Sequence, residues 1–265
     1  MATRAETGQN LARQIINIIA YVALFAVSVT AVTVPFNNNY LMDVVSRYNP
    51  DFMASAYVWY IFYIVEFVFL LCFIIYQGVS KRKNDRVLRS IDTPWYVFVV
   101  SNIIWTFGFF YDVQWLAFVA MLISAVALFY IFIELGIGRT KVTRCFYWCV
   151  HFPFAILAAS VIFGVVSETA MFCIRYNLIW WGIGQTAWTV IAMLAVGFFG
   201  SLFMHWRSDV GFGCTMVWFS AGIAVYQNNY DPVVTAFAYL LALYFAIVTY
   251  ACAMHKPRVN KKGSK

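Results

Sequence analysis

The chain is poor in charged residues, which make up 11% of its 265 positions, whereas a soluble domain has about 25%. It also has only six prolines, and only Pro153 falls well inside an apolar segment. No polar stretch is long enough to form a soluble domain beside a membrane anchor. These shortages exclude a soluble fold and leave a chain, 63% hydrophobic, that is suited to a bilayer.

Motifs of several enzyme classes are missing. The sequence contains no Gly-x-Ser-x-Gly, His-Glu-x-x-His or paired-carboxylate motif, and the Gly-Ile-Gly at 136–138 lacks the strand and helix of a phosphate loop. No apolar segment contains the lysine that a retinal Schiff base needs. We therefore expect that the protein is not an enzyme, and the residues name no cofactor and no metal site.

Eight apolar segments are long enough to cross a hydrocarbon layer of about 30 Å as helices. A very tight connection at Asp112 separates the third from the fourth, and the LMDVV stretch in the first loop predicts a short interfacial helix. We predict an all-α, polytopic integral membrane helix bundle that forms a single membrane domain over 1–265. The predicted spans are about 15–34, 54–77, 94–111, 113–135, 146–168, 180–205, 210–226 and 232–254.

The basic residues are distributed unevenly between the two sides of the predicted bundle. If the N-terminus is inside, only Arg47 and Arg175 of the 18 Lys and Arg fall outside. The positive-inside rule then predicts that both termini are inside, with 255–265 as a basic cytoplasmic tail. The basic residues behind the net charge of +7 lie in short loops between the spans, where they set the orientation of the protein in the membrane. We therefore expect a lipid bilayer and no nucleic acid as partner. The residues do not identify which membrane this is.

The second span carries one acidic residue, Glu66, at its centre, on the same helical face as Trp59 and Tyr63. A charge at this depth costs about 2.5–3.5 kcal/mol on insertion scales, so Glu66 is expected to face the bundle interior or a cavity. Two interpretations stay open, a ligand or proton site and a neutral glutamate that holds helices together. Glu134 and Glu168 lie at span ends, where we expect them to be solvated.

Other tryptophans and amides fall deep in the predicted spans. Asn102 and Trp105 share a stripe of the third span, Gln185 and Trp188 lie in the outer half of the sixth, and Trp218 lies near the middle of the seventh. These side chains suggest one aromatic cavity, although ordinary bundle packing explains the same stripes. The candidate ligand-binding residues are Trp59, Tyr63, Glu66, Asn102, Trp105, Gln185, Trp188 and Trp218.

Four stretches resemble the tryptophan-rich sensory protein relatives of the translocator protein (TspO/MBR) family, in its longer form with extra spans. They are FMASAYVWYIFYIVE at 52–66, NIIWTFGFFYDVQW at 102–115, Pro-Phe at 153–154 and WRSDVGFGCTMVWFSAGIA at 206–224. The first departs from the family's Phe-x-Pro-Ala-Gly-x-x-Phe-x-Ile-Trp pattern at Ala54, Ala56 and Phe62.

The resemblance implies a helical bundle that binds tetrapyrroles, sterol-like or lipidic ligands in an aromatic pocket. We expect the protein to bind or move such a hydrophobic small molecule, with Trp59, Trp105 and Trp188 as walls and Glu66 and Asn102 as polar contacts. One alternative is a structural subunit of a larger membrane assembly, with membrane protein partners or further copies of the chain. Another is a proton-coupled carrier that uses Glu66.

Overall fold

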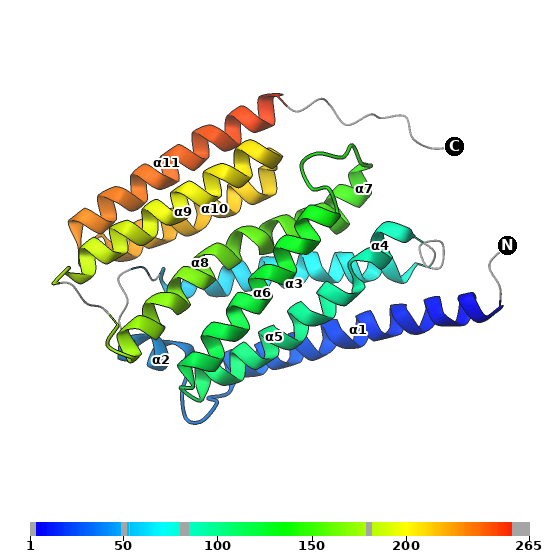
Figure 1. Cartoon of the computed structure of the whole chain (residues 1–265), viewed down its shortest axis with the longest axis horizontal. Coiled ribbons are helices and arrows are strands. Elements are labelled where there is room, and N and C mark those ends of the chain that lie inside the picture. The colour runs from blue at the N-terminus through cyan, green and yellow to red at the C-terminus, as the bar shows by residue number, and fades with distance from the viewer. Residues whose placement is uncertain (1–3, 49–51, 53, 80–84, 179–181, 256–265) are drawn as a thin grey trace.

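A computed structural model shows a bundle of α-helices that run roughly along one long axis (Figure 1). The structure describes residues 4–48, 52, 54–79, 85–178 and 182–255, and it contains no β-strand within them. Eight helical segments in this part of the chain are long and apolar enough to cross a membrane. The prediction of an all-α bundle with eight spans is therefore confirmed.

The eight long helices are joined by short connections and three short helices. The long helices are α1 (Arg4–Thr33), α3 (Ala56–Gly78), α5 (Asp92–Phe110), α6 (Gln114–Glu134), α8 (Phe152–Arg175), α9 (Gln185–Arg207), α10 (Val210–Gln227) and α11 (Pro232–His255). The short ones are α2 (Leu41–Tyr48), α4 (Arg86–Ser90) and α7 (Arg144–Phe146). Trp180, where the predicted sixth span begins, and all but the first residue of the predicted basic tail lie outside the described residues.

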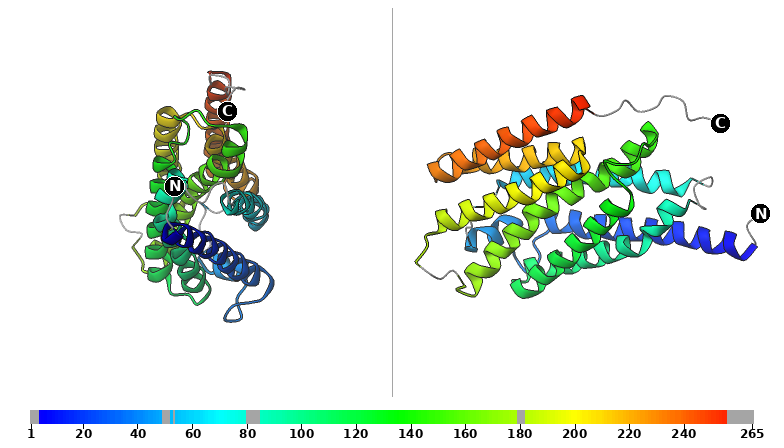
Figure 2. Two further views of the ribbon diagram at one scale, coloured as in Figure 1. Left: turned by 90° about the vertical axis from the view of Figure 1, so that its right-hand side faces the viewer. Right: turned by 45° about the horizontal axis from the view of Figure 1, so that its top comes forward.

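Helix α8 forms the centre of the bundle. It contacts α6, α10 and α3, while α1 and α5 lie toward one side and α9, α10 and α11 toward the other (Figures 1 and 2). In the spanning segment that contains α8, 78% of the residues of the most apolar stretch are buried, whereas in α1 only 22% are. Helix α1 therefore turns most of its surface to the bilayer. Phe154 and Phe163 of α8 are among the fully buried aromatic side chains of the core.

Helix α8 is preceded by a π-helical turn at Tyr147–His151, next to Pro153, the proline that falls well inside a predicted span. Pro153 has no backbone N–H to donate to the carbonyl four residues earlier, and its ring crowds the preceding turn. Widening this turn accommodates the proline without ending the helix. The apolar segment therefore continues as one long helical stretch from Arg144 to Arg175.

Helix α1 begins and α11 ends at the same end of the bundle (Figure 1). The junction between α9 and α10 and the connection from α6 to α7 lie at this end too. An even number of spans requires this arrangement. Which side of the membrane this end faces stays a prediction from the basic residues.

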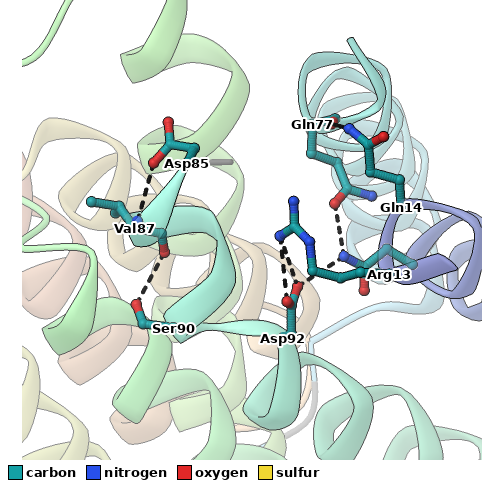
Figure 3. Close-up of polar contacts among 8 residues, drawn as sticks. Arg13, Gln14, Gln77, Asp85, Val87, Ser90 and Asp92 are labelled. Atoms are coloured by element: carbon teal, nitrogen blue, oxygen red, sulfur yellow. Dashed lines mark hydrogen bonds and ion pairs between the residues drawn. The ribbon is translucent and has the colours of Figure 1, made fainter. Parts of the chain in front are cut away.

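At this end a buried polar network connects α1 to α3 and α5 (Figure 3). Arg13 forms an ion pair of 3.3 Å with Asp92. Asn17 donates through its side-chain amide to Asp92 at 2.9 Å and to Gln77 at 2.7 Å, and Gln14 donates to the backbone carbonyl of Gln77 at 2.6 Å. These hydrogen bonds fix the position of a helix that otherwise has few buried contacts.

At the opposite end, the predicted interfacial helix α2 packs over the turn between α5 and α6. This turn is tight because Asp112 adopts a left-handed backbone conformation, with φ of 61°. The side chain of Asp112 accepts a hydrogen bond from the hydroxyl of Tyr48 and lies 3.8 Å from Arg47. Burial, with the hydrogen bond to Asp112 as the next cause, raises the pKa of Tyr48 to about 12, so its hydroxyl stays a donor.

Asp231 joins α9 to α11 at the same end. Its carboxylate accepts hydrogen bonds from the backbone N–H of Val233 at 2.8 Å and of Val234 at 3.1 Å, and from the hydroxyl of Thr186 at 2.6 Å. The hydrogen bond from Thr186, followed by those from the backbone, lowers the pKa of Asp231. A carboxyl group with a lowered pKa stabilises the fold above its unfolded pKa of about 4, and this contribution is lost as the pH falls through the folded pKa.

We therefore expect Asp231→Ala to lower the stability of the detergent-solubilised protein by about 1 kcal/mol at pH 6, as loss of a helix cap does. At pH 3 the gap between wild type and variant should narrow, because the wild-type carboxylate begins to protonate. Thermal unfolding midpoints at the two pH values measure this gap. Thr186→Val, which removes the hydrogen bond from Thr186 to Asp231, should likewise lower stability less at pH 3 than at pH 6. An equal gap at both pH values would contradict this account.

Candidate ligand-binding pocket

A pocket of about 490 Å³ lies between α1, α3 and α5, in the half of the bundle where α1 ends and α3 begins. Its walls are formed by side chains of α1, a stripe of α3, the second half of α5 and Leu41 of α2. The lining residues are Tyr21, Phe25, Ser28, Val29, Ala31, Val32, Thr33, Leu41, Tyr60, Tyr63, Ile64, Phe67, Val68, Leu71, Asn102, Trp105, Thr106 and Phe110. None of them carries a formal charge.

The pocket opens toward the bilayer between α1 and α3. Several of its apolar lining residues are also exposed on the outer surface of the bundle, where hydrocarbon surrounds a membrane helix: Phe25, Val29, Val32, Ile64, Val68 and Leu71. A molecule dissolved in the bilayer can therefore reach the pocket sideways, without crossing the aqueous interface.

Three predicted site residues, Tyr63, Asn102 and Trp105, meet at the inner wall of this pocket. The indole N–H of Trp105 donates to Glu168 at 2.7 Å, which fixes the ring as a wall and occupies its only donor. Within the described chain no hydrogen bond engages the side-chain amide of Asn102 or the hydroxyl of Tyr63. These two groups remain available to a ligand.

Two acids lie in the core beside this wall. Glu66 is 7% exposed and makes no hydrogen bond to a described residue, and Glu168 of α8 is 2% exposed. Tyr63, which lines the pocket, precedes Glu66 by about one turn of α3, so the two side chains lie on the same face of the helix. The expectation that Glu168 is solvated is wrong, because α8 continues past it to Arg175 and buries it against Trp105. Glu134 is exposed, as expected.

The remaining predicted site residues do not line the pocket. The ring of Trp59 packs against Phe219 at 4.4 Å, and the indole N–H of Trp218 donates to the backbone carbonyl of Val58 at 3.2 Å. Both contacts join α3 to α10. Gln185 and Trp188 belong to α9, which packs with α11, α8 and α10.

Sequence reasoning missed most of the pocket wall. On α3, Tyr60, Ile64, Phe67 and Leu71 share one helical stripe, which their spacing of three and four residues signals. No such pattern marks the pocket-lining residues of α1, because this helix carries apolar residues on nearly all of its faces. Among the described residues, no three His, Cys, Asp or Glu side chains gather as a metal site would require.

The fold and this pocket define a multi-pass integral membrane protein made of eight spanning helices. The profile of the family of TSPO-like proteins matches residues 14–251, which is most of the chain. The chain therefore belongs to the TSPO-like family, and the resemblance seen in its four sequence stretches is confirmed. No curated protein and no solved structure matches the chain.

Proposed function

We propose that the protein binds a neutral, hydrophobic small molecule, such as a sterol or a lipid, in the pocket between α1, α3 and α5. The observation that supports this most directly is a pocket of about 490 Å³ that is lined by apolar side chains and is open to the bilayer. Its volume falls in the range of about 300–1,000 Å³ typical of small-molecule sites.

The lining indicates the chemistry of the ligand. Apolar side chains cover most of the wall, and the amide of Asn102 and the hydroxyl of Tyr63 offer a small number of hydrogen bonds. These groups suit a hydroxyl or ester oxygen at one end of an apolar molecule. A tetrapyrrole with ionised carboxylates fits less well, because no lining residue is cationic.

Asn102→Leu should weaken binding of such a ligand roughly 2- to 12-fold, because one net hydrogen bond contributes about 0.5–1.5 kcal/mol. The purified protein in lipid nanodiscs would be titrated with a labelled sterol, a labelled phospholipid and a tetrapyrrole. Asn228→Leu is the matched control, since Asn228 is exposed in the turn after α10 and lies away from the pocket.

Binding of the sterol or phospholipid that Asn102→Leu weakens and Asn228→Leu leaves unchanged supports the proposal. If no member of the panel binds, and a stoichiometric membrane protein copurifies in mild detergent, the structural-subunit hypothesis replaces it. The carrier hypothesis rests on Glu66, which lies in the core beside the pocket wall and stays a prediction.

A further inference from the structure

Two arginines meet at the ring of Trp206, where α9 ends. The guanidinium carbon of Arg207 lies 4.2 Å from the centroid of the indole, and that of Arg139, from the connection after α6, lies 4.9 Å from it. Arg207 also lies 5.9 Å from the ring of Phe132. Two segments far apart in sequence thus bring two positive charges to one aromatic ring.

These charges lack an acidic partner within the described residues. Arg207 is 4% exposed, its Nε makes no hydrogen bond, and no carboxylate there forms an ion pair with it or with Arg139. The charged group that acts on Arg207 electrostatically is Arg139, a like charge. Asp209, two residues further on, accepts the backbone N–H of Phe212 at the start of α10. A buried cation next to a second cation is a costly arrangement without an anion.

The backbone holds this pair in place. Gly138 has φ of +79°, and a Cβ at this position would lie 1.8 Å from the carbonyl oxygen of Arg207. The connection after α6 therefore lies directly on the end of α9, which only glycine permits. Arg139, the next residue, is carried to Trp206 by this contact and is itself exposed.

The location suits a lipid headgroup. Trp206 is 42% exposed at the end of a spanning helix, where tryptophan commonly sits at the membrane–water interface. This is the end of the bundle that the basic residues assign to the cytoplasmic leaflet, whose anionic lipids attract Lys and Arg. Guanidinium groups pair with phosphate oxygens through directed, charge-assisted hydrogen bonds.

We propose that Arg139, Arg207 and Trp206 form a binding site for the phosphate group of a lipid with a net negative headgroup. Arg139 contacts the phosphate from the exposed side, Arg207 supplies the second positive charge from below, and Trp206 orients both guanidinium groups. This site is separate from the pocket between α1, α3 and α5, and the proposal does not depend on ligand binding there.

Native mass spectrometry of the full chain in detergent, with added phosphatidylglycerol or phosphatidylcholine, tests the proposal. We expect preferential retention of phosphatidylglycerol, weakened roughly fivefold or more by Arg139→Gln and by Arg207→Gln. Arg86→Gln is the matched control, because it removes an exposed cation at the same end of the bundle. Since Arg139 is exposed, its variant should fold even if Arg207→Gln does not.

Sodium phosphate in the same experiment distinguishes the source of the phosphate. If millimolar phosphate leaves retention unchanged, the site takes the lipid, as proposed. If phosphate displaces the lipid and protects the wild type but not Arg139→Gln against thermal unfolding, the site takes the free anion and the lipid proposal is overturned. Equal retention by wild type, Arg139→Gln and Arg86→Gln would also overturn it.

Discussion

Ser28→Phe is expected to abolish most binding of a hydrophobic ligand, with a loss of affinity of at least about tenfold, or ~1.4 kcal/mol. Ser28 lies on the pocket-lining side of α1, opposite the stripe of Tyr60 and Phe67 on α3. A phenyl ring added there occupies part of the 490 Å³ and competes directly with the ligand. Titration of the labelled sterol or phospholipid that the wild type binds best measures the loss.

The matched control is Ala26→Phe, two residues away on the same helix. Ala26 is exposed and does not line the pocket, so the added ring projects into lipid. Both variants gain similar apolar bulk, and the control removes no group that could form a hydrogen bond with a ligand. Equal affinity in Ser28→Phe and Ala26→Phe would place the binding site elsewhere, whatever their absolute values.

The spans were predictable because each one is a local property of the sequence. The length and apolar composition of a run such as 54–77 are enough to predict that it crosses the hydrocarbon layer. The tight connection at Asp112 and the short helix at 41–48 were also local signals. The end of α8 was misjudged because hydropathy falls at Glu168, whereas burial against Trp105 allows the helix to continue.

The pocket was only partly predictable because neighbouring helices are not specified by local pattern. Tyr63, Asn102 and Trp105 were found from their depth and residue type, and α3 and α5 both border the pocket. Trp188 lies at a similar predicted depth, but α9 packs on the other side of the bundle with α11. Depth follows from distance along a helix, whereas lateral position follows from the packing of all eight helices together.

Asp92→Ala is expected to cause a large loss of stability although Asp92 lies outside the pocket. The variant leaves Arg13, whose side chain is 9% exposed, as a charge without the carboxylate that it now pairs with. Asn17 loses one of its two acceptors at the same time. Breaking a buried ion pair from one side costs about 3–5 kcal/mol, and the slight exposure of Asp92 places the effect toward the lower end. Chemical or thermal unfolding in detergent measures it.

Asp85→Ala is the matched control, and Asp85 is also drawn in Figure 3. Its carboxylate caps the five-residue helix α4 by accepting the backbone N–H of Val87 at 3.0 Å, and such a cap contributes about 1 kcal/mol. A loss in Asp92→Ala no larger than in Asp85→Ala would mean that the network does not fix α1. The double variant Arg13→Leu with Asp92→Leu should recover part of the loss, because the buried charge of Arg13 is then removed together with that of Asp92.

The network also connects stability to the proposed binding. The second half of α1 forms one wall of the pocket. Near the other end of α1, Arg13 and Asn17 attach this helix to Asp92 of α5. If α1 loosens from α5, the two walls separate and the cavity loses its shape. Asp92→Ala should therefore also weaken ligand binding although Asp92 lies outside the pocket, and the double variant should restore binding together with stability.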